Sequence, residues 1–280
     1  MTDRHHPRTV LVTGGASGLG KATVAAFLAR GWNVAATARR PGAADRPDPA
    51  GNLLLLPMDV RDEESVGAAV ERAAERFGRI DCLVNNAGAG LLSVFEATPM
   101  TAVRDLFETN VFGVMRVTRA VLPHFAAQGG GRVVNVSSGA GIAPEPLMSL
   151  YSATKFAVEG FTESLRHELA VRGVTVKLVE PGLVPGTGFV RNTEEASRTV
   201  PVPPAYAGYV RQAVARYQEG VPTGVATPEA VAEAVAAAAE EPADRLRHLV
   251  GEDVEEAARM RRETSEREYE EWALARAAAG

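Results

Sequence analysis

Short apolar runs rich in β-branched residues recur along the chain and predict strands. They occupy residues 8–13, 32–38, 52–58, 80–86, 131–137 and 174–180, with a seventh candidate at 245–250. Segments of helix length separate these runs. Strands that are apolar on both faces and are each followed by a helix are typical of a parallel sheet, because parallel strands need long crossover connections. The pattern predicts an α/β fold in which a doubly wound parallel sheet of about seven strands carries helices on both faces.

The 280 residues contain no internal repeat and predict a single domain over residues 1–280. Residues 185–225 follow the sixth strand and are rich in Pro, Gly and Thr, which predicts an irregular substrate loop or lid. Residues 252–280 are charged and helix-favouring, which predicts a C-terminal helical extension with one packing stripe. Residues 39–51 are rich in Pro and Gly and predict a loop between the second and third strands.

Composition and charge narrow the range of partners. The net charge of −5 and the lack of a basic run give no general attraction to nucleic acid or to anionic membranes, so neither is expected as a partner. No stretch reaches about 18 uninterrupted apolar residues, so no membrane span is expected. Cys82 is the single cysteine and lies in an apolar run, which predicts a buried thiol and a reducing, cytoplasmic location. His5 and His6 lie in a polar stretch and are interpreted as solvated, so no metal site is expected.

A glycine-rich turn, TGGASGLGKA, follows the first predicted strand directly. Gly14, Gly18 and Gly20 would let the backbone bend tightly and approach a pyrophosphate, while the N-terminus of the next helix presents unpaired N–H groups to the anion. Such a turn can also be purely structural. The order of strand, turn and helix favours nucleotide binding.

The end of the second strand bears on the choice between NAD and NADP. An acidic residue there would bind the ribose hydroxyls and repel a 2′-phosphate, but this chain has Ala38 followed by Arg39 and Arg40. A guanidinium can make charge-assisted hydrogen bonds to phosphate, so NADP is favoured. The alternative is that both arginines are solvated loop charges. Asp59, after the third strand, is expected to accept a hydrogen bond from the adenine amino group, or else to be a turn or capping aspartate.

Tyr151 and Lys155 are spaced i and i+4 and would share one face of a helix. Lysine is rare here, since the chain has three lysines beside 27 arginines. An ammonium about 5 Å from the phenol would favour the phenolate by about 3 kcal/mol, or about two pKa units. The pair therefore predicts a lowered pKa of Tyr151, suited to general acid–base catalysis. A compact ammonium can also reach ribose hydroxyls, whereas a guanidinium is bulkier.

Ser138 ends the fifth predicted strand, at the carboxyl edge where open α/β sheets bind ligands. Its hydroxyl could donate to a substrate carbonyl as charge develops on the oxygen. Ser137 is an equal candidate on these grounds alone.

Further motifs stand in a fixed order, and these are TGxxxGxG at Thr13–Gly20, NNAG at Asn85–Gly88, Asn110 after the fourth strand, Ser138, YxxxK at Tyr151–Lys155 and PG at Pro181–Gly182. With this set, over about residues 8–190, the chain resembles the short-chain dehydrogenase/reductase family. The resemblance implies a Rossmann-type domain. The motifs are highly specific together.

The resemblance implies a catalytic tetrad. Tyr151 would donate or accept the proton, Lys155 would lower its pKa and hold the nicotinamide ribose, Ser138 would position the substrate oxygen, and Asn110 would hold a water in a proton relay. Ser138 is chosen over Ser137 because it lies thirteen residues before the tyrosine, as in the family. For Asn110 the alternative is an ordinary helix asparagine. The implied cofactor-binding residues are Gly14, Ser17, Gly18, Leu19, Gly20, Arg39, Asp59, Val60, Asn86, Ala87, Tyr151, Lys155, Pro181, Gly182 and Val184, the last near the carboxamide.

The length, the loop after Pro181 and the C-terminal helix are similar to the branch of 17β-hydroxysteroid dehydrogenases and related carbonyl reductases. One departure concerns the turn after the PG pair. The family usually places threonine at the fourth position after this pair, but here Gly186 stands there and Thr187 lies one residue further on. A one-residue insertion is expected, and the role of Thr187 stays open.

Together these features predict an NADP(H)-dependent oxidoreductase that moves a hydride between nicotinamide and a carbonyl or secondary alcohol. The alternatives are the same reaction with NAD(H), or a non-catalytic protein that senses NADP(H). The resemblance also implies a homo-oligomer, a dimer or tetramer, formed through the helices that hold Asn110 and Tyr151. A fairly hydrophobic substrate is predicted from the apolar residues of the stretch 185–217 and from Ile142, Pro144, Pro146 and Met148.

Overall fold

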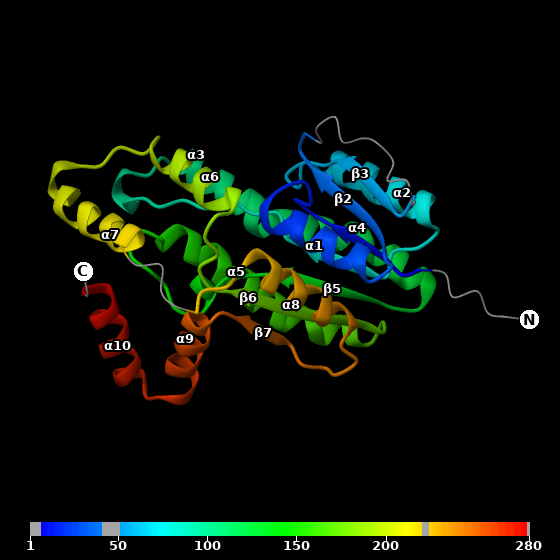
Figure 1. Cartoon of the computed structure of the whole chain (residues 1–280). Coiled ribbons are helices and arrows are strands. Elements are labelled where there is room, and N and C mark those ends of the chain that lie inside the picture. The colour runs from blue at the N-terminus through cyan, green and yellow to red at the C-terminus, as the bar shows by residue number, and fades with distance from the viewer. Residues whose placement is uncertain (1–6, 41–50, 220–223, 279–280) are drawn as a thin grey trace, which may run out of the picture.

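The computed structural model describes residues 7–40, 51–219 and 224–278, and a sheet of seven parallel strands lies at its centre (Figure 1). The strands are β1 (Thr9–Val12), β2 (Asn33–Ala38), β3 (Leu53–Pro57), β4 (Cys82–Asn85), β5 (Gly131–Val136), β6 (Val174–Pro181) and β7 (Arg247–Val250). Their order is β3-β2-β1-β4-β5-β6-β7, and every neighbouring pair is parallel. The strand order reverses between β1 and β4, which confirms the predicted doubly wound sheet.

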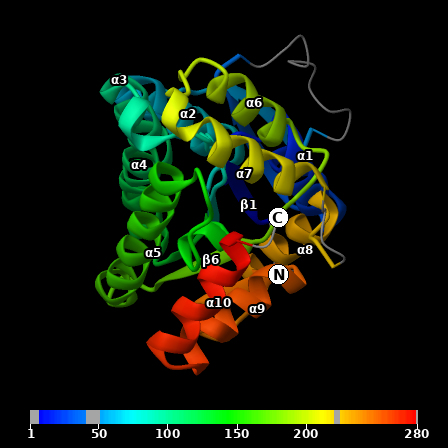
Figure 2. The ribbon, with the colours of Figure 1, turned by 90° about the vertical axis from the view of Figure 1, so that its left-hand side faces the viewer.

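Helices cover both faces of the sheet (Figures 1 and 2). One face carries α1 (Gly18–Ala29) and α8 (Pro228–Glu240), and the other carries α2 (Glu63–Phe77), α4 (Gly113–Gln128) and α5 (Ser149–Ala170). Side chains of β1 alternate between the faces. Val10 and Val12 join the core under α1 and α8, whereas Leu11 joins the core on the other side. All three are fully buried, which explains why the strand is apolar throughout.

Short elements connect the strands and helices on the carboxyl side of the sheet. They are the 3₁₀ turns η1 (Phe95–Ala97), η3 (Gly139–Gly141) and η4 (Pro204–Tyr206), the helix α3 (Met100–Phe107) and the π-helical turn η2 (Glu108–Phe112). Within residues 39–51, which were predicted to form a loop, residues 41–50 lie outside the described residues.

The stretch after β6 is more regular than its composition predicted. Residues 185–225 contain α6 (Gly188–Ser197) and α7 (Ala207–Glu219), so the expected irregular loop is wrong for most of its described length. Pro201, Pro203 and Pro204 fall in the link between the two helices and do not interrupt either. Apolar residues recur at helical spacing in α7 and pack against the loops after β4 and β5; they are Val210, Ala213 and Val214.

The C-terminal extension forms two helices, α9 (Glu252–Glu263) and α10 (Glu266–Ala278). Val254 of α9 packs on Ile142, and Tyr269 of α10 packs on Ala143 and Ala257. The predicted packing stripe therefore exists, but it faces the loop after β5 and folds the extension back onto the domain. Figure 2 looks onto this end of the molecule, with α6 and α7 on one side and α9 and α10 on the other.

Cys82 lies inside β4 and is fully buried as a free thiol. Burial raises its pKa to about 12, so the thiol stays protonated. The predicted structural role of this cysteine is confirmed. None of the described helices is long and apolar enough to cross a membrane.

Candidate active site

A cavity of about 1640 Å³ opens at the carboxyl edge of the sheet. Its walls come from the turn after β1, from the ends of β2 to β6, from α5, and from α6, α7, α9 and α10. All the residues predicted to bind the cofactor line it, together with Ser138. Asn110 is the exception among the predicted site residues, because it is not part of the lining. The tertiary fold thus brings together residues from position 14 to position 184.

The glycine-rich turn between β1 and α1 has the geometry that an anion site needs. Gly14 and Gly18 have φ values of 67° and 48°, in the left-handed region that favours glycine. A β-carbon on Gly20 would lie 2.1 Å from the carbonyl oxygen of Gly14, so no other residue fits there. Ser17 precedes α1 and makes no side-chain capping bond, which leaves the first N–H groups of α1 open to a phosphate.

The NNAG segment is joined to this turn by hydrogen bonds through Thr13. The Thr13 hydroxyl accepts from the main-chain N–H groups of Asn86 and Ala87, both at 2.9 Å. The side chain of Asn86 in turn donates to the Thr13 carbonyl at 2.8 Å. Asn86 and Ala87 therefore line the cavity, as predicted, and also hold the turn in register with β4. The role of Thr13 as the joining residue was not anticipated from the sequence.

Arg39 and Arg40 are exposed at the end of β2 and line the cavity next to Asp59. Asp59 forms an ion pair with Arg61, in which Nη2 donates to Oδ2 at 2.7 Å, and it also accepts from the Arg61 main-chain N–H at 3.0 Å. These bonds from Arg61 hold the pKa of Asp59 below its ordinary value. Asp59 is thus both a turn aspartate and a cavity residue. Arg61 also lines the cavity and was missed, although its position two residues after Asp59 could have suggested the pair.

Tyr151, Lys155 and Ser138 meet at one wall of the cavity. Tyr151 and Lys155 are 7% and 8% exposed and lie one turn apart in α5, and Lys155 Nζ is 5.7 Å from the centre of the Tyr151 ring. Lys155 Nζ donates to the carbonyl of Val136 at 3.1 Å. The Ser138 hydroxyl lies close enough to the Tyr151 phenol to act against the rise of its pKa, and its Oγ accepts from the Ala140 N–H at 3.2 Å. Ser137 also lines the cavity, but its Oγ is buried with no hydrogen-bond partner among the described residues, so the proximity to the phenol distinguishes Ser138.

The expected lowering of the Tyr151 pKa is wrong for this structure. Burial raises the pKa of Tyr151 to about 12, and the neighbouring Ser138 hydroxyl offsets only part of this rise. Burial also lowers the pKa of Lys155 to about 8, against the opposing charge of Glu159. Both shifts follow from the removal of water around groups that would otherwise be solvated in their charged forms. The sequence spacing showed the pair but not how deeply it is buried.

Asn110 lies in η2, the π-helical turn between α3 and α4, and is 2% exposed. Its Oδ1 accepts from the N–H of Ala89 at 2.8 Å, and its Nδ2 donates to the carbonyl of Ala89 at 2.8 Å and to the Thr154 hydroxyl at 3.1 Å. Thr154 precedes Lys155, so Asn110 joins the segment after β4 to α5. A π-helical turn changes the hydrogen bonding of main-chain carbonyls and is frequent at functional sites. The implied water relay stays a prediction.

The turn after β6 carries Pro181, Gly182 and Val184 into the cavity lining. Gly186 has a φ of 73°, and Thr187 follows it at the start of α6 with its hydroxyl donating to the Val184 carbonyl at 3.2 Å. Thr187 therefore lines the cavity beside Val184 despite the shifted motif. The glycine in a left-handed conformation accommodates the extra residue in this turn.

The far side of the cavity, beyond Tyr151, is largely apolar. Phe189 of α6 lies 5.8 Å from Tyr151 between ring centres, and Met148 is part of the lining, whereas Ile142, Pro144 and Pro146 are not. The remaining apolar lining residues include Leu92, Val94, Leu147, Val200, Val202, Val210, Val214, Val254 and Ala257. At the outer edge of this apolar wall, polar side chains of α7 and α10 bond to the loop after β5.

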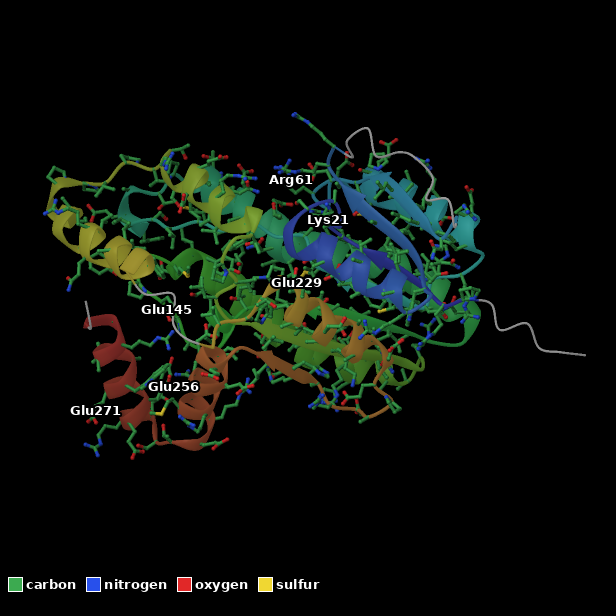
Figure 3. The ribbon with its side chains drawn as sticks, viewed as in Figure 1. Lys21, Arg61, Glu145, Glu229, Glu256 and Glu271 are labelled. Carbon is green, nitrogen blue, oxygen red and sulfur yellow. The ribbon has the colours of Figure 1, made fainter. Side chains whose placement is uncertain are left out.

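Arg276 of α10 reaches back to this rim and donates to Glu145 at 2.7 Å; both residues line the cavity. Figure 3 shows Glu145 on the side of the molecule that α10 approaches. Tyr217 of α7 donates to the carbonyl of Pro146 at 2.9 Å. The two C-terminal helices and α7 therefore meet the loop after β5 at one place.

No group of three or more potential metal ligands occurs within residues 7–40, 51–219 and 224–278, and His5 and His6 lie outside these ranges.

The model of the short chain dehydrogenase family matches residues 8–198. The chain is similar to the uncharacterized oxidoreductase YusZ of Bacillus subtilis, with 40% identity over 182 residues that cover 62% of this chain and 64% of that protein. It is also similar to the 3-ketodihydrosphingosine reductase of Bacteroides thetaiotaomicron, with 38% identity over 186 residues that cover 66% of this chain and 67% of that protein. The chain thus spans less than two thirds of the length of YusZ.

Solved structures show the same fold over a larger part of the chain. A short-chain dehydrogenase from Streptomyces avermitilis has 35% identity and a TM-score of 0.79, covering 98% of both chains. A short chain dehydrogenase/reductase from Burkholderia phymatum in complex with NAD has 27% identity and a TM-score of 0.78, covering 94% of this chain and 95% of that one. One from Burkholderia cenocepacia in complex with NADP has 29% identity and a TM-score of 0.71, covering 91% and 92%.

Proposed function

The chain belongs to the short-chain dehydrogenase/reductase family, and from this premise we propose that it is an NADP(H)-dependent oxidoreductase that transfers a hydride between nicotinamide and a carbonyl or secondary alcohol. One observation carries the proposal. Ser138, Tyr151 and Lys155 line the same cavity as the glycine-rich turn of Gly14 to Gly20, so a dinucleotide on that turn and a substrate at the phenol occupy one continuous space.

The residues of the cavity fit a dinucleotide. A β-carbon on Gly20 would collide with the Gly14 carbonyl, so glycine keeps the turn tight, and the N-terminus of α1 offers N–H groups to a pyrophosphate. When bound, the nicotinamide group supplies the hydride chemistry. The protein would hold the pyrophosphate with Gly14 and Ser17 and orient the nicotinamide with the turn after β6.

The chain's own residues handle the proton. Tyr151 donates a proton to the carbonyl oxygen in reduction and accepts one from the alcohol in oxidation. Ser138 holds the phenol and donates to the same oxygen as negative charge develops on it. Lys155 would stabilise the phenolate and hold the ribose hydroxyls of the cofactor. Because burial raises the pKa of Tyr151 to about 12, the phenol is protonated at neutral pH, and this is the form that carbonyl reduction requires.

A preference for NADP(H) is supported by the charges at the end of β2. Ala38 stands where a carboxylate would repel a 2′-phosphate, and Arg39, Arg40 and Arg61 line the adjacent part of the cavity. Similar structures contain NADP in one case and NAD in another, so the arginines of this chain carry the argument. NAD(H) use is the competing possibility.

A fairly hydrophobic substrate is supported by the apolar wall beyond Tyr151, where Phe189 and Met148 face the same space. The same wall would suit a long-chain ketone. In keeping with this, a similar protein is named a 3-ketodihydrosphingosine reductase. The segment that holds α6 and α7 would act as the lid.

We also propose a homo-oligomer, a dimer or tetramer, that forms through the helices that hold Asn110 and Tyr151. Phe112 and Phe156, on these helical segments, are 44% and 39% exposed, which is unusual for large apolar side chains. Light scattering of the purified protein tests the oligomer.

A cytoplasmic location is also proposed, from the free thiol of Cys82, which persists in a reducing compartment.

The function is tested by NADPH oxidation with ketones, quinones and steroid-like carbonyls, comparing the unsubstituted protein with Tyr151→Phe. Turnover should be lost in the variant while NADPH still binds. Turnover that survives the substitution would exclude Tyr151 as the proton donor. Tight NADPH binding by both proteins without turnover over the whole panel would favour a non-catalytic, NADP(H)-sensing role.

A further inference from the structure

A cluster of charged side chains extends along α5 beyond Lys155. Arg247, at the start of β7, donates from Nη1 to the carboxylates of Glu159 in α5 and Glu180 in β6, the latter at 2.7 Å. Its Nη2 donates to Glu163, one turn further along α5. Arg262 of α9 approaches Glu180 at 3.4 Å. Glu159 and Glu180 are 6% and 0% exposed, so most of this network is removed from water.

Glu159 is the member of the cluster next to the catalytic lysine. It follows Lys155 by one helical turn, as Lys155 follows Tyr151, so the three side chains lie along one face of α5. Gly141 packs over both residues, since a β-carbon there would lie 3.1 Å from Glu159 Cγ and 3.3 Å from Lys155 Cβ. One oxygen of Glu159, Oε1, is buried with no hydrogen-bond partner among the described residues. Arg247 therefore bonds to only one of the two oxygens of the Glu159 carboxylate.

Two carboxylates of the cluster are buried and share one guanidinium. Glu159, Glu163 and Glu180 face Arg247 and Arg262, and the remaining neighbour of Glu159 from the turn after β5 is the uncharged hydroxyl of Ser137, near Gly141. Glu163 is exposed and solvated, so the buried carboxylates are those of Glu159 and Glu180, and Arg247 is the guanidinium that bonds to both. The ammonium of Lys155 adds a second positive charge on the same face of α5. A buried charge without a partner is strongly unfavourable, so the cluster and the ammonium stabilise each other.

The ionisation of the cluster fits this role. Burial and the neighbouring Glu159 raise the pKa of Glu180 to about 7, whereas the pKa of Lys155 is about 8. Glu180 is therefore ionised over the alkaline range in which Lys155 loses its proton. Burial alone would lower the pKa of Lys155 further, and Glu159 is the charge that opposes it.

We propose that Glu159 is a positioning residue for Lys155, whose buried carboxylate, anchored by Arg247, keeps the lysine charged and in place beside Tyr151. The importance of this role for catalysis rests on the function proposed above, in which Lys155 assists Tyr151. The coupling between the two side chains can be measured without any turnover.

The small number of lysines makes a direct test possible. Protein labelled with ¹³C at the lysine ε-carbons gives signals from Lys21, Lys155 and Lys177 only, and Lys21→Arg and Lys155→Arg assign them by difference. In Glu159→Gln, the Lys155 signal should titrate about one pH unit lower, a tenfold fall in the ratio of charged to neutral lysine. The matched control Glu163→Gln removes an exposed carboxylate from the same arginine and should leave the Lys155 titration within about 0.3 units. An unchanged Lys155 titration in Glu159→Gln would overturn the proposal.

A second variant covers the case in which Glu159→Gln does not fold. Arg247→Gln removes a positive charge and keeps Glu159, so the Lys155 titration should move to higher pH, opposite to the first variant. A shift to lower pH, or none, would contradict the proposed anchoring. The alkaline limb of the pH profile of kcat/KM should follow the lysine titration in every variant. If the lysine shifts as expected while no carbonyl is reduced, the proposed reaction fails and the positioning of Lys155 stands.

Discussion

Asp253, in the first turn of α9, accepts a hydrogen bond from the main-chain N–H of Leu183 at 2.9 Å, across 70 residues of sequence. The contact is close because Gly182 has no side chain, and a β-carbon there would lie 2.0 Å from Asp253 Oδ1. The C-terminal helices therefore fix the turn after β6, which lines the part of the cavity assigned to the cofactor. Under the proposed function, the C-terminal extension would therefore support the cofactor as well as the substrate wall.

Replacing Asp253 should weaken NADPH binding more than catalysis. Asp253→Ala leaves the Leu183 N–H without its partner, which should lower the free energy of unfolding by about 1–3 kcal/mol. The loosened turn must then be ordered on binding, so KM for NADPH should rise by up to about tenfold, the factor that 1.4 kcal/mol represents, with a smaller change in kcat. Asp253→Asn keeps an acceptor oxygen, so its free energy of unfolding should fall less and its KM for NADPH should rise less than in Asp253→Ala. Urea denaturation and steady-state kinetics measure both effects, and equal losses in the two variants would contradict this role.

Cofactor preference should depend on Arg39. In Arg39→Asp, a charge-assisted hydrogen bond worth about 1.5–3 kcal/mol is replaced by repulsion of the 2′-phosphate, so kcat/KM with NADPH should fall by about a hundredfold. Turnover with NADH should change little. The control Arg72→Asp makes the same change in net charge on the exposed surface of α2, away from the cavity. An unchanged ratio of NADPH to NADH use in Arg39→Asp would assign the choice of cofactor to other residues.

Carbonyl reduction should decline in alkaline solution with the titration of Lys155. Its pKa is about 8 because it is buried, so its ammonium is present below this pH and is lost above it. Tyr151, with a pKa of about 12, stays protonated over the same range, so its titration does not cause the fall of kcat/KM above pH 8. Thus kcat/KM should be level from about pH 6 to pH 8 and then fall about tenfold per unit.

Lys155→Arg supplies the control for this assignment. A guanidinium stays charged to well above pH 10, so the alkaline limb should disappear, although kcat should be lower because the planar group has a different shape. A limb that remains near pH 8 in this variant would mean that another group titrates there.

Lys177 should contribute strongly to stability and not to the reaction. Its side chain in β6 is fully buried, pairs with Glu241 at 3.3 Å, and donates to the carbonyls of Ala243 and Arg245 between α8 and β7. Lys177→Met should lower the free energy of unfolding by about 3 kcal/mol, since it leaves these carbonyls without their donor. Lys21→Met, at an exposed position of α1, should change it by less than about 0.5 kcal/mol. Thermal and urea unfolding compare the two, and equal stabilities would contradict the assignment.

The predicted strands, the glycine-rich turn and the Tyr151–Lys155 pair depend on residues close together in the sequence. That is why each could be found before the structure was known. The irregular loop predicted for residues 185–225 shows the limit of this approach. Composition did not reveal that its prolines fall between two helices, or that Val210 and Val214 pack against loops from elsewhere in the chain.

The sequence by itself determined the doubly wound sheet and the motif residues that line the cavity, because periodicity and motif spacing are local properties of the chain. Arg61 and the lining residues of α9 and α10 were found only in the structure. Only the tertiary structure decided which distant residues these side chains bond to and in which direction their pKa values shift. The bond from Leu183 to Asp253 spans 70 residues and the ion pair of Arg247 with Glu159 spans 88, so no local pattern contains them. The direction of the Tyr151 pKa shift likewise depends on burial, which arises only when distant segments pack around the phenol and exclude water.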